Sequence, residues 1–173
     1  MNLYCQDESR FGLHTQTGKM LTAKGIKPIA VSLQDFESTW LFGAFSPINA
    51  KKLLVEFPFC NTDTFQIFIN LLSETDDEEL MLLLLDNASF HKAKRLIIPD
   101  NIVLINIPPY SPELNPAEQI WAWFKRAFTN KAFTSMDEVR QFIDNQTKLL
   151  SDSIVKSTCF RKWLFPCNYW TGL

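Results

Sequence analysis

Three acidic residues stand where apolar segments end, at Asp7, Asp86 and Glu118. Asp86 follows the run LMLLLL, residues 80–85, whose length and apolar character are typical of a strand buried on both faces. Such strands belong to sheets covered by helices, and ligands bind beyond their carboxyl ends. Asp7 ends a first apolar segment, and Glu118 opens a helix after a third one at 101–110. If these strands are neighbours, the three carboxylates converge.

The residue types indicate the chemistry that such a site would perform. Three carboxylates without cysteine and with little histidine form a hard oxygen site, which suits Mg²⁺ or Mn²⁺ better than zinc. Two such ions could activate a nucleophile on one side of a phosphorus atom and stabilise the leaving oxygen on the other. The pattern therefore predicts a nuclease or strand-transfer site with two ions. Glu113 is an alternative third ligand.

Each acid also has a structural interpretation. Asp86 could cap the helix that follows it. Asp7 could form a surface ion pair with Arg10, which would contribute under about 1 kcal/mol. Glu118 could complete a capping box with Asn115 at the start of its helix, although a carboxylate held there is also well placed to bind an ion. Spacing alone leaves these alternatives open.

The elements that must position the acids follow from periodicity and turn residues. Apolar segments at 3–6, 40–45 and 52–57 predict a first, antiparallel set of strands. Later segments alternate between helix and strand, which is typical of a mixed sheet with helices on its faces. We expect a lysine-bearing hairpin or exposed loop at 12–28 and a helix capped by Asn61 or Thr62. The buried leucine strand should follow, then a short helix at 90–96, a buried strand at 101–110, and helices from 116 and over 135–150.

The whole chain is of a size and composition for one globular domain. Its 173 residues are 46% hydrophobic and 21% charged, and no apolar stretch is long enough to span a bilayer. The N-terminal sequence lacks a signal-peptide pattern, so we expect a cytoplasmic protein. The four cysteines form no CxxC pair, which favours reduced thiols over a disulfide or a zinc site.

The charges are unevenly distributed along the chain. The net charge is −2, but residues 91–173 are basic, with eleven Lys or Arg against seven acids. That distribution is compatible with a nucleic-acid partner.

Three sequence blocks resemble one known family. They are QDESRFG at 6–12, LLLLDNASFH at 82–91 and PPYSPELNPAEQIWAWFK at 108–125. Together they are similar to the signature blocks of mariner-like bacterial insertion-sequence transposases, whose catalytic part is called the DDE endonuclease domain. The resemblance covers about residues 1–150. It implies an α/β, ribonuclease H-like mixed sheet, with three antiparallel strands followed by parallel ones, and Asp7, Asp86 and Glu118 as the metal-binding triad.

The resemblance also implies an activity and partners. The family cleaves double-stranded DNA at transposon ends with Mg²⁺ or Mn²⁺, and the freed 3′-hydroxyl then attacks target DNA without a covalent protein intermediate. A homodimer and a separate N-terminal transposase half are the implied protein partners, and the bacterial nucleoid is the implied place of action. Candidate DNA contacts are His91, Lys92, Lys94, Arg95, Lys125 and Arg126.

The chain departs from the family pattern at both ends. The helix-turn-helix module that precedes the catalytic domain in the family is expected to be absent, since the first block begins at residue 6. The aromatic tail, residues 151–173, is expected to pack on the domain or on a partner. Two alternatives therefore stay open: an inactive remnant that acts as an interaction or regulatory module, and a ribonuclease H-like enzyme that cleaves RNA–DNA hybrids.

Overall fold

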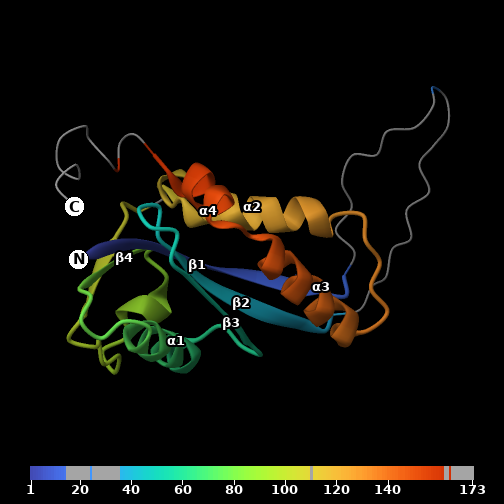
Figure 1. Cartoon of the computed structure of the whole chain (residues 1–173). Helices are drawn as coiled ribbons and strands as arrows, with labels where there is room; N and C mark the ends of the chain where they lie inside the picture. Colours follow the sequence, from blue (N-terminus) through green and yellow to red (C-terminus); the bar gives the residue numbers. More distant parts are fainter. Residues whose placement is uncertain (15–23, 25–35, 110, 162–163, 165–173) are drawn as a thin grey trace.

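A mixed β-sheet forms the centre of the molecule (Figure 1). The computed structural model describes residues 1–14, 24, 36–109, 111–161 and 164. Within these residues five strands form one sheet in the order β3-β2-β1-β4-β5. β1 pairs antiparallel with β2 and parallel with β4, β2 pairs antiparallel with β3, and β4 pairs parallel with β5. This confirms the predicted mixed sheet. The strands are β1 (Asn2–Gly12), β2 (Ser38–Phe45), β3 (Lys52–Phe57), β4 (Met81–Leu85) and β5 (Ile102–Asn106).

The leucine run is the buried strand that its composition predicts. β4 lies between β1 and β5, and its side chains alternate between two hydrophobic clusters. Met81, Leu83 and Leu85 belong to the cluster on one face, while Leu84 belongs to the cluster on the other. Because both faces need apolar side chains, the strand shows no polar alternation. The first polar residue, Asp86, follows where the strand leaves the sheet.

Helices cover both faces of this sheet, with α1 on one side and α2, α3 and α4 on the other (Figure 1). Asn61 caps α1, since its Oδ1 accepts hydrogen bonds from the backbone N–H groups of residues 63 and 64. The predicted stripe on α2 is buried, with Trp121 and three other apolar side chains at most 1% exposed. The helices are α1 (Thr62–Glu74), α2 (Ala117–Phe128), α3 (Met136–Leu149) and α4 (Asp152–Cys159).

Two predictions about the connection from β4 to β5 were wrong. The helix expected at 90–96 is a single 3₁₀ turn, η1 (Ser89–Lys92), because Ala93 has extended backbone and ends it. The strand expected to be buried, β5, lies at the edge of the sheet and leaves Val103 43% and Ile105 37% exposed. An apolar strand composition therefore does not show whether both faces are covered.

Other predictions concern the rest of the chain. Cys5, Cys60 and Cys159 are free thiols, as predicted, while Cys167 lies outside the described residues. The loop predicted at 12–28 also lies largely outside them. Of the helices in the described ranges, none has the length and apolar character needed to cross a bilayer.

Candidate active site

The three acids lie on elements that meet at the carboxyl end of β4. Asp86 directly follows β4, and Asp7 stands on β1 just beyond Cys5, the last residue that pairs with β4. Glu118 is in the first turn of α2, which covers the face of the sheet that Cys5 also faces. Side chains of a strand alternate between its faces, so Asp7 points to the same side as Cys5. The fold thus brings one acid from each of three elements together.

Asn115 attaches the start of α2 to β1 beside Asp7. Its Nδ2 donates to the backbone oxygen of Gln6 at 2.8 Å, and its Oδ1 accepts from the backbone N–H of Ala117 at 3.1 Å. Asn115 is 2% exposed, so both hydrogen bonds are protected from water. The capping box that was the alternative role of Glu118 does not form, because Pro116 is the N-cap residue of α2 and the side chain of Glu118 makes no cap bond there. Glu118 is exposed instead.

Gly43 lets α2 approach the sheet at the level of Asp7. Gly43 is the β2 partner of Asp7, and a Cβ atom added to it would lie 2.5 Å from Cζ of Phe45 and 2.9 Å from Cη2 of Trp121. Both aromatic side chains are fully buried and have no room to move. The close packing of α2 at this point therefore requires glycine.

We accordingly expect the substitution Gly43→Ala to destabilise the protein by about 1–3 kcal/mol, the usual cost of overpacking a core. It should also displace Trp121, and with it the helix that carries Glu118. Chemical denaturation would measure the stability. An unchanged unfolding free energy would show that the core accommodates the methyl group.

Asp7 is in an environment that opposes its negative charge. Burial, followed by the nearby carboxylates of Glu118, Glu8 and Asp86, raises the pKa of Asp7 from 3.8 to about 8. The acids therefore lie close enough to repel one another. A cation bound between them would relieve this repulsion.

Asp86 is instead stabilised as a charged group. The hydrogen bond from His91 and the N–H of Ala88 hold the pKa of Asp86 below its usual value of 3.8, although partial burial acts in the opposite direction. For His91, burial opposes the charge, but the hydrogen bonds to Asp86 and Glu8 outweigh it and raise the pKa of the ring to about 9. These two contacts therefore favour the protonated form of the His91 ring.

Oxygen donors for a hard cation are present, although their side chains do not converge on one point. In the described part of the chain, no group of three or more His, Cys, Asp or Glu side chains is already arranged to hold a metal ion. Asp86 directs Oδ1 to His91 and Ala88 at 3.0 and 2.9 Å, and Glu118 is exposed. The three carboxylates fit Mg²⁺ or Mn²⁺ by donor type, and the repulsion of Asp7 by the neighbouring carboxylates favours a cation there.

Sequence reasoning missed two residues that border the acids. Glu8 is buried and contacts His91, and the carboxylates of Glu8, Asp86 and Asp7 help to raise the pKa of Cys60 to about 12, after burial. Strand alternation was a usable signal for Glu8, because the neighbour of Asp7 must face the opposite side of the sheet. Cys60 gave no comparable signal.

The six predicted DNA contacts fall in different environments. His91 is buried, whereas the five basic residues are exposed. Lys92 donates to the side chain of Asn87, Arg95 forms an ion pair with Asp63 at 2.9 Å, and Arg126 donates to a backbone oxygen of its own helix. The burial of His91 favours a role within the protein over a contact with DNA.

Two cavities lie close to these residues. One of about 300 Å³ adjoins Asp86 and is lined by Asn87, Pro108 and Pro109 among others. Another, of about 360 Å³, is lined by Arg10 and Lys125 and lies further along β1 and α2. Both are open surface hollows next to the acids or along the elements that carry them.

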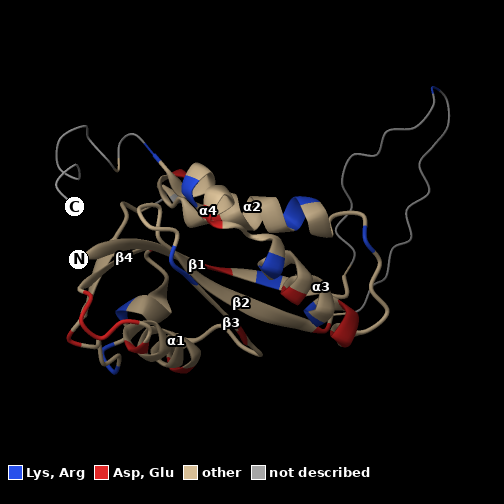
Figure 2. Ribbon diagram, in the orientation of Figure 1, with Lys and Arg blue, Asp and Glu red and all other residues tan. Residues whose placement is uncertain are grey.

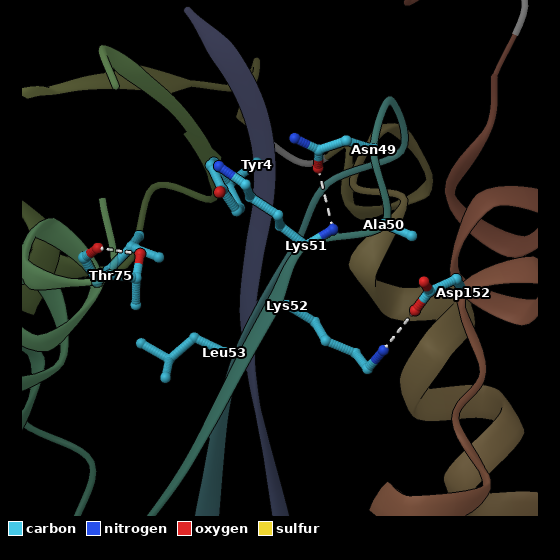
Figure 3. Close-up of a pocket in the computed structure, with 9 residues that line it drawn as sticks. Tyr4, Asn49, Ala50, Lys51, Lys52, Leu53, Thr75 and Asp152 are labelled. Carbon is cyan, nitrogen blue, oxygen red and sulfur yellow. Dashed lines mark hydrogen bonds and ion pairs between the residues drawn. The ribbon is translucent and has the colours of Figure 1, made fainter. Parts of the chain in front are cut away.

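A larger cavity of about 510 Å³ lies toward the end of the sheet where β1 and β3 begin, and Tyr4, Lys51 and Lys52 are among its lining residues (Figure 3). Each charged side chain that lines it is already paired, Lys51 with Asp76 and Glu79, and Lys52 with Asp152. The acidic loop between α1 and β4 borders this end beside the N-terminus of β1 (Figure 2). With its charges neutralised within the protein, this cavity is a weaker candidate than the region around Asp7.

Comparisons with known proteins identify the family and the fold. A family model described as DDE superfamily endonuclease matches residues 2–140. The uncharacterized protein y4pE/y4sA of Sinorhizobium fredii is 31% identical over 122 residues, which make up 65% of this chain and 90% of the relative.

Solved structures show the same fold. The Mos1 transposase paired-end complex with left transposon end aligns with a TM-score of 0.69 and 20% identity, covering 91% of this chain and 51% of that chain. The Mos1 mariner paired-end complex with Mn aligns with a TM-score of 0.70 and 20% identity over the same shares. The fold is therefore ribonuclease H-like, as predicted. This chain spans about half the length of these solved structures.

Proposed function

Because this chain belongs to the DDE superfamily endonuclease family, we propose that it is the catalytic domain of a DNA transposase. It would cleave DNA strands in a metal-dependent reaction and then join the new 3′-hydroxyl end to target DNA. The observation that carries this proposal is the proximity of Asp7 to Glu118 and Asp86, whose carboxylates contribute to the raised pKa of Asp7. The similar Mos1 structures include complexes with a transposon end, with Mn and with Mg, which supports the same substrate and ions here.

All three carboxylates would take part in ion binding. By the resemblance to the family, Asp7 would hold both ions, and Asp86 and Glu118 would each help to hold one. Two bound Mg²⁺ or Mn²⁺ ions would lower the pKa of the attacking water or 3′-hydroxyl and stabilise the leaving oxygen. Burial of Asp7 would keep bulk water from screening its interaction with the ions.

Each of the two displacements forms one P–O bond and breaks another. No covalent protein–DNA intermediate is therefore needed. In the first, water attacks a phosphodiester phosphorus and the P–O3′ bond breaks, which leaves a 3′-hydroxyl and a 5′-phosphate. In the second, this 3′-hydroxyl attacks a phosphodiester of the target strand and displaces its 3′-oxygen. The protein residues would hold both substrates in line at the same carboxylates.

Basic residues beyond the acids provide a path for the DNA backbone. Arg10 lies three residues beyond Asp7 on β1, and Lys125 lies seven residues beyond Glu118 on α2. Each is therefore about 10 Å from the corresponding acid, given the rise of a strand and of a helix. They line one cavity, so a phosphate one or two nucleotides from the cleaved bond could bind between them. Lys92, Lys94, Arg95 and Arg126 are candidates for outer backbone contacts.

The direct test is DNA nicking by the purified protein. We expect supercoiled or linear duplex DNA carrying candidate ends to be nicked in Mn²⁺ or Mg²⁺ and left intact in EDTA. An RNA–DNA hybrid of the same sequence should be a poorer substrate. Preferential cleavage of the hybrid would contradict the transposase proposal and favour a ribonuclease. Size-exclusion chromatography with and without the duplex would test the homodimer that the family resemblance implies.

A further inference from the structure

The side chains of Glu8, His91 and Asp86 contact one another in a row that ends at Asp86. Glu8 Oε1 lies 3.2 Å from Nε2 of His91, and Nδ1 of His91 lies 3.0 Å from Oδ1 of Asp86. The side chains of Glu8 and His91 are buried, at 7% and 1% exposure, whereas that of Asp86 is 48% exposed. The contacts join β1, η1 and the end of β4, and Glu8 and His91 are separated by 83 residues in sequence.

The hydrogen-bonding capacities of these groups define their roles. A carboxylate only accepts hydrogen bonds, so a ring nitrogen that faces one must carry a hydrogen. Both ring nitrogens of His91 face carboxylates, and Glu8 Oε1 also accepts from Nε2 of Gln6 at 2.7 Å. Glu8 therefore anchors the inner nitrogen of the ring, and the outer nitrogen donates to Asp86.

Aromatic packing fixes the plane of the ring. The rings of Phe65 and Phe90 lie 4.3 and 4.2 Å from that of His91, measured between centroids. His91 can therefore neither turn away from Asp86 nor reach solvent. The inner carboxylate and the two aromatic rings together hold it in one orientation.

Asp86 receives two donors on the same oxygen. Oδ1 accepts from the backbone N–H of Ala88 at 2.9 Å and lies 3.0 Å from Nδ1 of His91, which also lies 3.4 Å from the backbone oxygen of Asp86. This holds the carboxylate plane and leaves Oδ2 for an external partner. Groups that hydrogen-bond a metal ligand orient it in this way in many metal sites.

We propose that Glu8 and His91 are positioning residues that hold Asp86 so that it binds its ion through Oδ2 alone. The inference rests on the proposed metal site. The dipeptide of residues 7 and 8 then serves both faces of β1, with Asp7 as a ligand on the α2 side and Glu8 as the anchor of His91 on the α1 side. Adjacent residues of β1 would therefore supply one metal ligand, Asp7, and the support of another, Asp86.

The test is Mn²⁺ binding to the metal-free protein, measured by calorimetry for the wild type, for Glu8→Gln, and for the double variant Glu8→Gln/His91→Phe. The double variant leaves no buried charge unpaired and keeps a ring between Phe65 and Phe90, so it should fold. We expect both variants to bind Mn²⁺ about 10- to 100-fold more weakly than the wild type. The control Asp144→Asn removes an exposed ion pair with Lys148 and should bind like the wild type.

The outcomes separate this inference from the proposed function. A wild type that binds no Mn²⁺, with or without duplex DNA, would contradict the metal site itself. A wild type that binds Mn²⁺ and folded variants that bind it equally well would overturn only the positioning role. Nitrogen-15 NMR of the wild type at neutral pH gives a second measurement that does not depend on variant folding. The ring nitrogen that faces Asp86, Nδ1, should carry hydrogen, and a bare Nδ1 would overturn the proposal.

Discussion

Replacing Asp7 with asparagine should stabilise the metal-free protein and abolish its cleavage of DNA. Burial and three neighbouring carboxylates raise the pKa of Asp7 to about 8, so its charge opposes folding. An asparagine of the same shape removes that charge. In EDTA at pH 8 we expect the variant to be more stable by about 2 kcal/mol or more, since each unit of pKa elevation corresponds to about 1.4 kcal/mol. Nicking should fall roughly 100- to 1,000-fold, as when one electrostatic stabiliser of a transition state is lost.

The pH dependence of this difference has a defined sign. At low pH, Asp7 is neutral in both the folded and the unfolded wild type. As pH rises above 3.8 the unfolded chain ionises while the folded protein keeps its proton until about pH 8. The wild type therefore loses stability over this range, and its difference from the asparagine variant grows until about pH 8. Urea denaturation at pH 4, 6 and 8 in EDTA would measure it. A difference that does not change with pH would contradict the raised pKa.

The same replacement by asparagine at Asp86 should have the opposite effect on stability to that at Asp7. Its charge is stabilised by His91 and Ala88, so the substitution Asp86→Asn should destabilise the metal-free protein while also abolishing nicking. Addition of Mn²⁺ should stabilise the wild type and neither variant. If both substitutions changed stability in the same direction, the two acids would not have the distinct environments that the structure shows.

Replacing Asn115 with alanine should weaken both the fold and the site. The change removes the hydrogen bond to the backbone oxygen of Gln6, leaves that oxygen unpaired in a buried position, and removes the acceptor for the N–H of Ala117. We expect a loss of about 2 kcal/mol, within the range for an unsatisfied buried polar group. Because this contact aligns Glu118 with Asp7, nicking by the folded variant should fall by roughly tenfold or more. Thermal unfolding and nicking rates would measure the two effects.

A capping residue far from the acids supplies the control for Asn115. Ser135 caps α3 by accepting a hydrogen bond from the N–H of Glu138 at 3.3 Å. The substitution Ser135→Ala should cost about 1 kcal/mol of stability and leave nicking by the folded protein unchanged. If the two variants lost activity equally at equal stability, the contact between Asn115 and Gln6 would have no special role in placing Glu118.

The sequence by itself determined which residues could carry the chemistry. A buried strand must be apolar along its length, so the first charge after it marks a strand end, as at Asp86. The same local reasoning predicted the strands at 40–45 and 52–57, the cap at Asn61, the helix that begins near Ser135, and the apolar stripe of α2. These features depend on residues a few positions apart, which periodicity and turn chemistry describe well.

Only the tertiary structure decided how those residues are held. The contact of Asn115 with Gln6 joins residues 109 positions apart, and that of His91 with Glu8 joins residues 83 apart. The order of strands in the sheet brings such pairs together, and the same order leaves β5 at an edge with half-exposed isoleucine and valine. Local periodicity carries no information on that order. The three acids could therefore be proposed as site residues from the chain alone, whereas their electrostatic environments and their supporting contacts depend on packing between distant segments.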